Sequence, residues 1–202
     1  VSTLTTILGL VVAVPAAYAF SRFSFPGRNF LFFSVLLRNM FPAVIFLIPL
    51  FILMRWVGLV NTHGSLVITY LTFGLPLAIF LLYSFISQLP RDLFESAAID
   101  GATHLQTFMR IVLPLSIPAL GAIAIFQFLW VWNDLLVALV FLGPGAEVRV
   151  LPTALFQLIG SRGGSWHLLT AGAFITMVVP LLVFLLLQRA FVRGILAGSV
   201  KA

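Results

Sequence analysis

Long apolar stretches are the feature that most constrains how this chain can fold. A helix needs about 20 apolar residues to cross a hydrocarbon core of about 30 Å. Five stretches of that order lie between polar breaks, near residues 1–20, 30–54, 66–87, 117–142 and 168–187. None shows the alternating pattern, about ten residues long, that is typical of outer-membrane barrels. The sequence therefore predicts an all-α bundle of five transmembrane spans, with residues 1–202 forming a single transmembrane domain.

The composition supports a membrane protein and excludes several other classes. Hydrophobic residues make up 62% of the chain and charged residues 8%, too few charges to enclose a soluble core, so we expect membrane lipid around it. The basic residues are scattered singly, which does not favour nucleic-acid binding. The absence of cysteine excludes disulfides and thiolate metal sites. His63, His104 and His167 lie in predicted loops without neighbouring ligands, so we expect no catalytic triad and no metal site.

Basic residues in the connecting segments predict the orientation, because Lys and Arg gather on the cytoplasmic side. One side receives Arg22, Arg28, Arg91, Arg110, Arg189, Arg193 and Lys201, and the other receives Arg55, Arg149 and Arg162. The first side, with the C-terminus, is therefore predicted to be cytoplasmic, and the protein is predicted to be a multi-pass membrane protein. Val1 would then lie in a span that starts outside, so we expect at least one earlier helix. A cleaved signal peptide is the alternative for residues 1–20, although no basic region precedes Leu4.

The longest cytoplasmic segment, residues 88–118, is predicted to form two short helices joined by a tight turn. Asp92 and Glu95 have the spacing of a capping box and begin the first helix. Gly101 supplies the left-handed position that ends it.

The second helix of this segment is predicted to begin at Thr103, with Gln106 completing another capping box. An apolar stripe follows at helical spacing, formed by Leu105, Phe108, Met109 and Val112, and Pro114 and Pro118 are expected to end the helix. Such an amphipathic hairpin has two plausible uses: it can pack on its own bundle, or it can insert into a groove of a soluble partner.

The same segment resembles a known family. Glu95-Ser96-Ala97, then Gly101, then Ile111-Val112-Leu113-Pro114 resembles the "EAA" loop of permease subunits of binding-protein-dependent ATP-binding-cassette (ABC) importers, with Ser96 in place of the usual alanine. Three flanking stretches are similar to the carbohydrate-type, maltose-permease branch: residues 16–22 (AAYAFSR), 132–134 (WND) and 188–201 (QRAFVRGILAGSVK).

The resemblance implies a type I importer permease fold that lacks the first family helix, located in a prokaryotic cytoplasmic (inner) membrane. It implies carbohydrate transport together with ABC ATPase subunits, a second homologous permease and an external substrate-binding protein. It also implies that ATP and Mg bind to the ATPase. The positions expected to couple to that ATPase are Glu95, Ser96, Ala97, Asp100, Gly101, Ile111, Leu113 and Pro114. The residues agree independently, since Lys201 is the only lysine and no phosphate-binding loop is present, so we expect no enzyme activity and no cofactor in this chain.

The fourth span carries a candidate substrate pathway. Gln127, Trp130 and Asp134 lie at i, i+3 and i+7, with Asn133 nearby, and place an aromatic ring beside amide and carboxylate groups. Sugars suit such a face, because their apolar faces stack on indole and their hydroxyls bond to polar groups. The alternative is that these residues join helices through hydrogen bonds inside the bundle.

Arg38 is the other ionisable residue at membrane depth, where a charge is costly. It is expected either to pair with Asp134 or to extend toward the cytoplasmic surface, and we favour the second. An Arg38–Asp134 pair would be consistent with a different class of protein, a subunit of an ion-gradient-driven secondary transporter or channel. A membrane assembly factor is a third class.

The external loop, residues 143–167, is rich in glycine and carries further basic and aromatic residues. They are Gly143, Gly145, Gly160, Gly163, Gly164, Arg149, Arg162 and Trp166. The loop is expected either to contact a soluble external partner or to serve as a plain connector.

Overall fold

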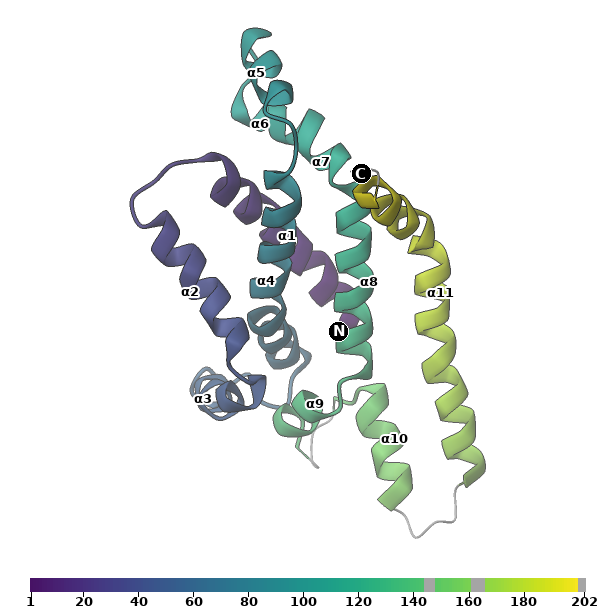
Figure 1. Ribbon diagram of the computed structural model, residues 1–202. Coiled ribbons are helices and arrows are strands. Elements are labelled where there is room, and N and C mark those ends of the chain that lie inside the picture. Colours follow the sequence, from purple (N-terminus) through teal and green to yellow (C-terminus); the bar gives the residue numbers. More distant parts are fainter. Residues whose placement is uncertain (144–147, 161–165, 200–202) are drawn as a thin grey trace.

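Helices form all of the regular structure in the part of the chain that the computed structural model describes, residues 1–143, 148–160 and 166–199. Figure 1 shows their arrangement. The elements are α1 (Ser2–Arg22), α2 (Arg28–Met40), α3 (Ala43–Trp56), α4 (His63–Ser87), α5 (Asp92–Ile99), α6 (His104–Thr107), the π-helical turn η1 (Phe108–Val112), α7 (Leu113–Leu115), α8 (Ile117–Asn133), α9 (Leu136–Phe141), α10 (Leu151–Gly160) and α11 (Trp166–Ser199). The predicted all-α bundle is confirmed for these residues.

The bundle is built around α1, which packs against α4 and α8, while α11 packs along α8. In Figure 1, α5 and α6 project from one end of the bundle, which we call the hairpin end. The short helices α3, α9 and α10 lie at the opposite end. The last described turns of α11 lie on the same side as α7, so α11 ends toward the hairpin end.

Small side chains allow α1 to approach α4 closely. Ala13 and Ala17 are 0% exposed, and a Cβ placed on Gly9 would lie 3.6 Å from Leu71 of α4. In lipid the hydrophobic effect does not drive helices together, so close packing of this kind supplies the contact energy. Ile86 at the end of α4 and Val112 of η1 are 0% exposed in the same cluster. The core at the hairpin end is therefore shared between the bundle and the hairpin.

Three helical segments are long and apolar enough to span a membrane: α1, α4 and residues Trp166–Gln188 of α11. Two bent helix pairs raise the number to five if each pair counts as one span, and this agrees with the number predicted. The span predicted at 30–54 is broken in two, because α2 and α3 meet at an angle of 107°. Pro42 explains the break, since a proline disfavours helical geometry at the residue before it, and Phe41 is extended with ψ of 139°.

The predicted span at 117–142 is also shorter than expected. Helix α8 ends at Asn133, Asp134 is extended with ψ of 121°, and α9 begins only at Leu136. At its other end α8 forms the second bent pair, meeting the helical segment His104–Leu115 at 68°.

The segment predicted as an external loop, residues 143–167, contains the helix α10. Several residues singled out in the sequence lie outside the described residues, namely Gly145, Arg162, Gly163, Gly164 and Lys201.

Candidate functional site

The turn between α5 and α6 follows the prediction for Gly101. This residue has a φ of +73°, the left-handed conformation that favours glycine. The amide of Ala102 donates to the carbonyl of Ala97 at 2.9 Å, and the amide of Gly101 donates to the carbonyl of Ala98 at 3.1 Å. These two bonds form a Schellman motif, which satisfies carbonyls that the end of a helix leaves free. The turn therefore fixes where the hairpin reverses.

The capping box predicted at the start of α5 was wrong. Arg91 is the N-cap residue, it has helical geometry, and no side chain caps the helix. Asp92 and Glu95 both lie in the first turn of α5. There the two carboxylates stabilise the positive end of the helix dipole without bonding to a capping amide.

The second predicted capping box is confirmed. The amide of Thr103 donates to Oε1 of Gln106 at 2.8 Å, and the amide of Gln106 donates to Oγ1 of Thr103 at 3.3 Å. Helix α6 then continues without a stop into η1 and α7. The helical segment ends at Leu115, directly after Pro114, and meets α8 at 68°, as expected for a proline at the end of a helix. Pro118 does not end this helix but lies in the first turn of α8.

The apolar stripe predicted along the second helix is divided between two environments. Val112 is 0% exposed and Phe108 packs against the core cluster. Leu105 and Met109 are 66% and 54% exposed. Two residues of the stripe, Phe108 and Val112, therefore pack on the bundle, and the other two, Leu105 and Met109, are free to insert into a groove of a partner.

Three large apolar side chains of the hairpin are exposed, and we call this set the hairpin face: Ile99, Leu105 and Met109. Ile99, at the end of α5, is 86% exposed. The carboxylate residues Glu95 and Asp100 are exposed on the same helical hairpin. Exposed apolar side chains at a tip that also carries charges are typical of a surface that contacts a partner.

The structure places all eight predicted coupling residues in the hairpin or in the helix that follows it. Their exposure differs. Glu95, Ser96, Asp100, Gly101 and Pro114 are exposed, Ile111 and Leu113 are half-buried, and Ala97 is 5% exposed. The buried position of Ala97 explains why a small side chain suits it.

A central cavity of about 520 Å³ lies between α2, α4 and α8. It brings together two of the predicted pathway residues, Gln127 and Trp130, with Arg38 of α2. The rest of the lining is formed by Asn39, Phe73, Gly74, Leu77, Ala78, Leu81, Ile123 and Phe126. Gly74 matters here, because a Cβ at this position would collide with the side-chain amide of Gln127. The cavity is thus apolar and aromatic, with a few polar groups, as small-molecule sites usually are.

Arg38 contacts α4 within this cavity. Its Nη1 donates to the carbonyl of Phe73 at 3.3 Å, and its guanidinium lies 4.6 Å from the centre of the Phe73 ring and 5.5 Å from that of Phe46. Nη2 is buried and makes no hydrogen bond within the described residues. Arg38 therefore turns toward the bundle, contrary to the extension toward the surface that we favoured.

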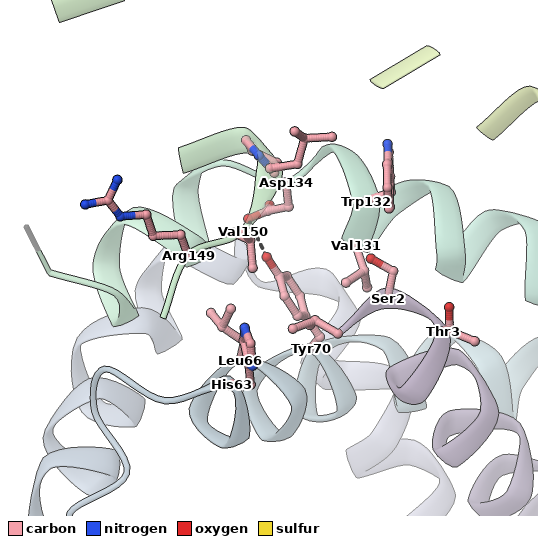
Figure 2. A pocket seen from close by; sticks show the side chains of 13 residues that line it. Ser2, Thr3, His63, Leu66, Tyr70, Val131, Trp132, Asp134, Arg149 and Val150 are labelled. Atoms are coloured by element: carbon pink, nitrogen blue, oxygen red, sulfur yellow. Dashed lines mark hydrogen bonds between the residues drawn. The ribbon is translucent and has the colours of Figure 1, made fainter. Parts of the chain in front are cut away.

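Asp134 lies at a second, outer cavity of about 240 Å³, which Figure 2 shows. The hydroxyl of Tyr70 donates to Oδ1 of Asp134 at 3.2 Å, and the amide of Val137 donates to the same oxygen at 2.8 Å. Asp134 thus joins α4 to the start of α9, at the point where α8 breaks. The residues around it in Figure 2 include His63, Arg149, Ser2 and Thr3.

The four predicted pathway residues do not form one face. Gln127 and Trp130 line the central cavity, Asp134 lines the outer one, and Asn133 is exposed with its amide donating to Leu129 of its own helix at 2.8 Å. Tyr70, which sequence reasoning missed, lines the cavity of Asp134 and contacts one residue of the other cavity. It bonds to Asp134, and its ring meets that of Trp130 edge-on with centroids 5.6 Å apart. The signal available in the sequence was the hydroxyl of Tyr70, a polar group within an apolar span that needs a hydrogen-bond partner.

Arg38 and Asp134 line different cavities and form no ion pair in the part of the chain that is described. The described side chains also contain no cluster of three His, Asp or Glu residues that could hold a metal ion.

The chain is similar to permease proteins over nearly all of its length. It is 52% identical to the osmoprotective compounds uptake permease protein GgtD of Synechocystis, over 98% of this chain and 66% of the relative. It is 50% identical to the alpha-glucoside transport system permease protein AglG of Rhizobium meliloti, over 98% of this chain and 53% of the relative. The chain therefore spans about half to two thirds of the length of these relatives.

The fold also matches a solved structure. A bacterial ABC transporter involved in the import of the acidic polysaccharide alginate has a chain that matches with a TM-score of 0.71 at 20% identity, covering 95% of this chain and 77% of that chain. A likeness at this identity concerns the fold alone, and it confirms the importer-type bundle that was predicted. Residues 6–197 match the family described as "binding-protein-dependent transport system inner membrane component". The chain belongs to the family of inner membrane components of binding-protein-dependent transport systems.

Proposed function

We propose that this chain is the membrane-spanning permease subunit of an ABC importer, which moves a carbohydrate across the cytoplasmic membrane of a prokaryote. ATP hydrolysis, with its Mg, takes place in partner ATPase subunits. A second permease and an external substrate-binding protein complete the assembly. In this orientation the hairpin end and the C-terminus face the cytoplasm, as the distribution of Arg and Lys indicates.

The observation that carries this proposal is the hairpin face. Ile99, Leu105 and Met109 are more than half exposed, while Phe108 and Val112 of the same hairpin are held in the core of the bundle. An apolar surface anchored in this way and projecting beyond the spans suits insertion into a groove of a soluble protein. Glu95 and Asp100 on the hairpin supply charges that a basic partner residue can meet.

The carbohydrate substrate is supported by relatives and by chemistry. The relatives include an alpha-glucoside permease and the trehalose transport system permease protein SugB of Mycobacterium tuberculosis, which is 39% identical over 100% of this chain. Within the central cavity, Trp130 offers a ring for stacking, and Gln127 and Arg38 offer hydrogen bonds to hydroxyl oxygens. We assign Gln127 and Trp130 to the substrate pathway, with Asn133 and Asp134 toward its outer side.

A gradient-driven carrier is less well supported. That alternative used Asp134 and Arg38 as a coupling pair, but each has other contacts: Asp134 with Tyr70 and Val137, and Arg38 with Phe73. A gradient-driven carrier also has no use for an exposed cytoplasmic hairpin.

Copurification tests the proposed function. The tagged full-length protein is purified in mild detergent from its native membrane, and its partners are identified by mass. We expect an ATPase with a phosphate-binding loop to accompany the parent protein. Ile99→Asp, Leu105→Asp and Glu95→Lys should each reduce its recovery, by about tenfold or more if the contact contributes about 1.4 kcal/mol.

Asn29→Asp is the matched control, because Asn29 is exposed at the same end of the bundle but outside the hairpin. It should leave ATPase recovery unchanged. Absence of any ATPase from the parent preparation would refute the importer assignment, and equal recovery with all three hairpin variants would refute the docking role of the hairpin face.

A further inference from the structure

Arg22, at the last position of α1, bonds to the segment that leads from α4 into the hairpin. Its Nη2 donates to the carbonyl of Ile86 at 3.0 Å and to that of Leu89 at 3.4 Å. Ile86 lies in the final turn of α4, and Leu89 follows that helix. The last carbonyls of a helix lack partners within it, and a guanidinium is well suited to satisfy them. One side chain of α1 therefore holds the exit of α4.

The same guanidinium also contacts the first helix of the hairpin. Its central carbon lies 3.5 Å from the centre of the Phe94 ring of α5, a close cation–π contact. Phe94 belongs to the shell around the buried core at this end. Arg22 is thus shared by three helices, α1, α4 and α5, although its partners lie more than sixty residues away in sequence.

One turn earlier, Tyr18 makes a parallel set of contacts to the second arm of the hairpin. Its hydroxyl donates to the carbonyl of His104 at 3.4 Å, and its ring lies 5.1 Å from that of Phe108. Phe23, just after α1, meets the ring of His104 edge-on at 5.0 Å. Both arms of the hairpin are therefore attached to the end of α1.

We call the contacts of Arg22 and Tyr18 with the end of α4 and with the hairpin the joint. The connection from α4 to α5 contains Pro90, which has no amide N–H, so helical hydrogen bonds do not run on from α4 into α5. The contacts of Arg22 therefore link the two helices where the backbone ladder does not. We propose that Arg22 is a positioning residue that makes α1, the end of α4 and the hairpin move as one unit. This inference rests on the proposed function, because it concerns how a displacement of the hairpin by the ATPase reaches the spans that line the pathway.

The chemistry at this joint calls for arginine. The guanidinium is planar, so it can stack on Phe94 and still direct an N–H toward the carbonyls of Ile86 and Leu89. A lysine keeps the charge but presents a compact ammonium that does not reproduce this geometry. Arg22→Lys is therefore a sharper variant than the removal of the whole side chain.

The test uses the complete importer, purified with its partners and reconstituted in lipid vesicles with its external binding protein. Two quantities are measured in the same vesicles: ATP hydrolysis, and uptake of radiolabelled trehalose and maltose. We expect Arg22→Lys and Arg22→Ala to retain the ATPase but to lower the sugar taken up per ATP hydrolysed by about tenfold, if the joint is worth about 1.4 kcal/mol. Phe94→Leu, which keeps an apolar side chain but removes the ring, should lower the same ratio by less.

Arg28→Lys is the matched control. Arg28 lies at the same end, but its Nε donates to the carbonyl of Phe20 within the same part of the chain, at 2.7 Å, and does not reach the hairpin. If the sugar taken up per ATP hydrolysed is unchanged in the Arg22 variants, with the ATPase still bound, the positioning role of Arg22 is refuted and the proposed function is not. Loss of the ATPase from Arg22→Lys would also refute that role, because Arg22 would then only shape the docking surface. If the parent carries no ATPase, both proposals fall. If Arg22→Ala fails to fold, the sugar taken up per ATP hydrolysed by Arg22→Lys and Phe94→Leu still tests the proposal.

Discussion

At the scale of single residues, Asp134 has a structural use that its sequence context did not reveal. It accepts hydrogen bonds from the Tyr70 hydroxyl and from the amide of Val137, and Tyr70 is 2% exposed. Asp134→Ala leaves this buried hydroxyl unpaired, so we expect a loss of about 1–3 kcal/mol of stability, seen as a lower thermal midpoint in detergent. Tyr70→Phe removes the hydroxyl as well as its need for a partner and should cost less.

Asp134→Asn is the informative control, because an amide oxygen can still accept from Tyr70 and Val137. It should retain most of the stability. If Asp134→Ala instead leaves the thermal midpoint unchanged and abolishes sugar uptake, Asp134 acts on the substrate rather than on the fold.

At the scale of elements, the turn of the hairpin depends on one backbone conformation. A Cβ at Gly101 would meet nothing within 4 Å, so the only penalty of Gly101→Ala is its φ of +73°. Side chains other than glycine pay about 1–2 kcal/mol there. We expect Gly101→Ala to loosen the turn, measured as faster hydrogen exchange in α5 and α6 and as weaker recovery of the ATPase.

Asn tolerates the left-handed region better than Ala does. Gly101→Asn should therefore fall between the parent and Gly101→Ala in both measurements. Equal exchange rates in all three proteins would show that the core contacts of the hairpin, and not its turn, determine its shape.

At the scale of the whole molecule, the central cavity exists only because α2, α4 and α8 come together. Trp130 lines it and is 38% exposed. If its ring stacks on the sugar, Trp130→Ala should lower trehalose or maltose uptake by about two- to tenfold while ATPase recovery stays normal, since an aromatic contact of this kind is worth about 0.5–1.5 kcal/mol.

Trp166→Ala provides the comparison, because Trp166 is 71% exposed on α11 and does not line this cavity. It should leave uptake unchanged. A fall in the thermal midpoint of Trp130→Ala without a change in uptake would assign Trp130 to packing against Tyr70 instead.

Local signals in the sequence predicted the features that local interactions decide. Gly101 ends α5, and Thr103 with Gln106 caps α6, because those bonds join residues at most a few positions apart. The same logic failed at Asp92, where the turn preceding α5 leaves Arg91 in helical geometry and the capping position unused. A capping box needs extended backbone at its first residue, and spacing alone does not report that conformation.

The sequence by itself determined that the chain lies in a membrane, that it is helical, and that a capped hairpin interrupts its spans. Those properties follow from the composition, from the length of the apolar stretches and from residue patterns spaced three or four positions apart. Only the tertiary structure decided that Arg22 meets Phe94, that Arg38 and Gln127 share a cavity, and that Asp134 turns to Tyr70. These partners lie far apart in the chain, and their meeting depends on how α1, α4 and α8 pack, which no local pattern encodes.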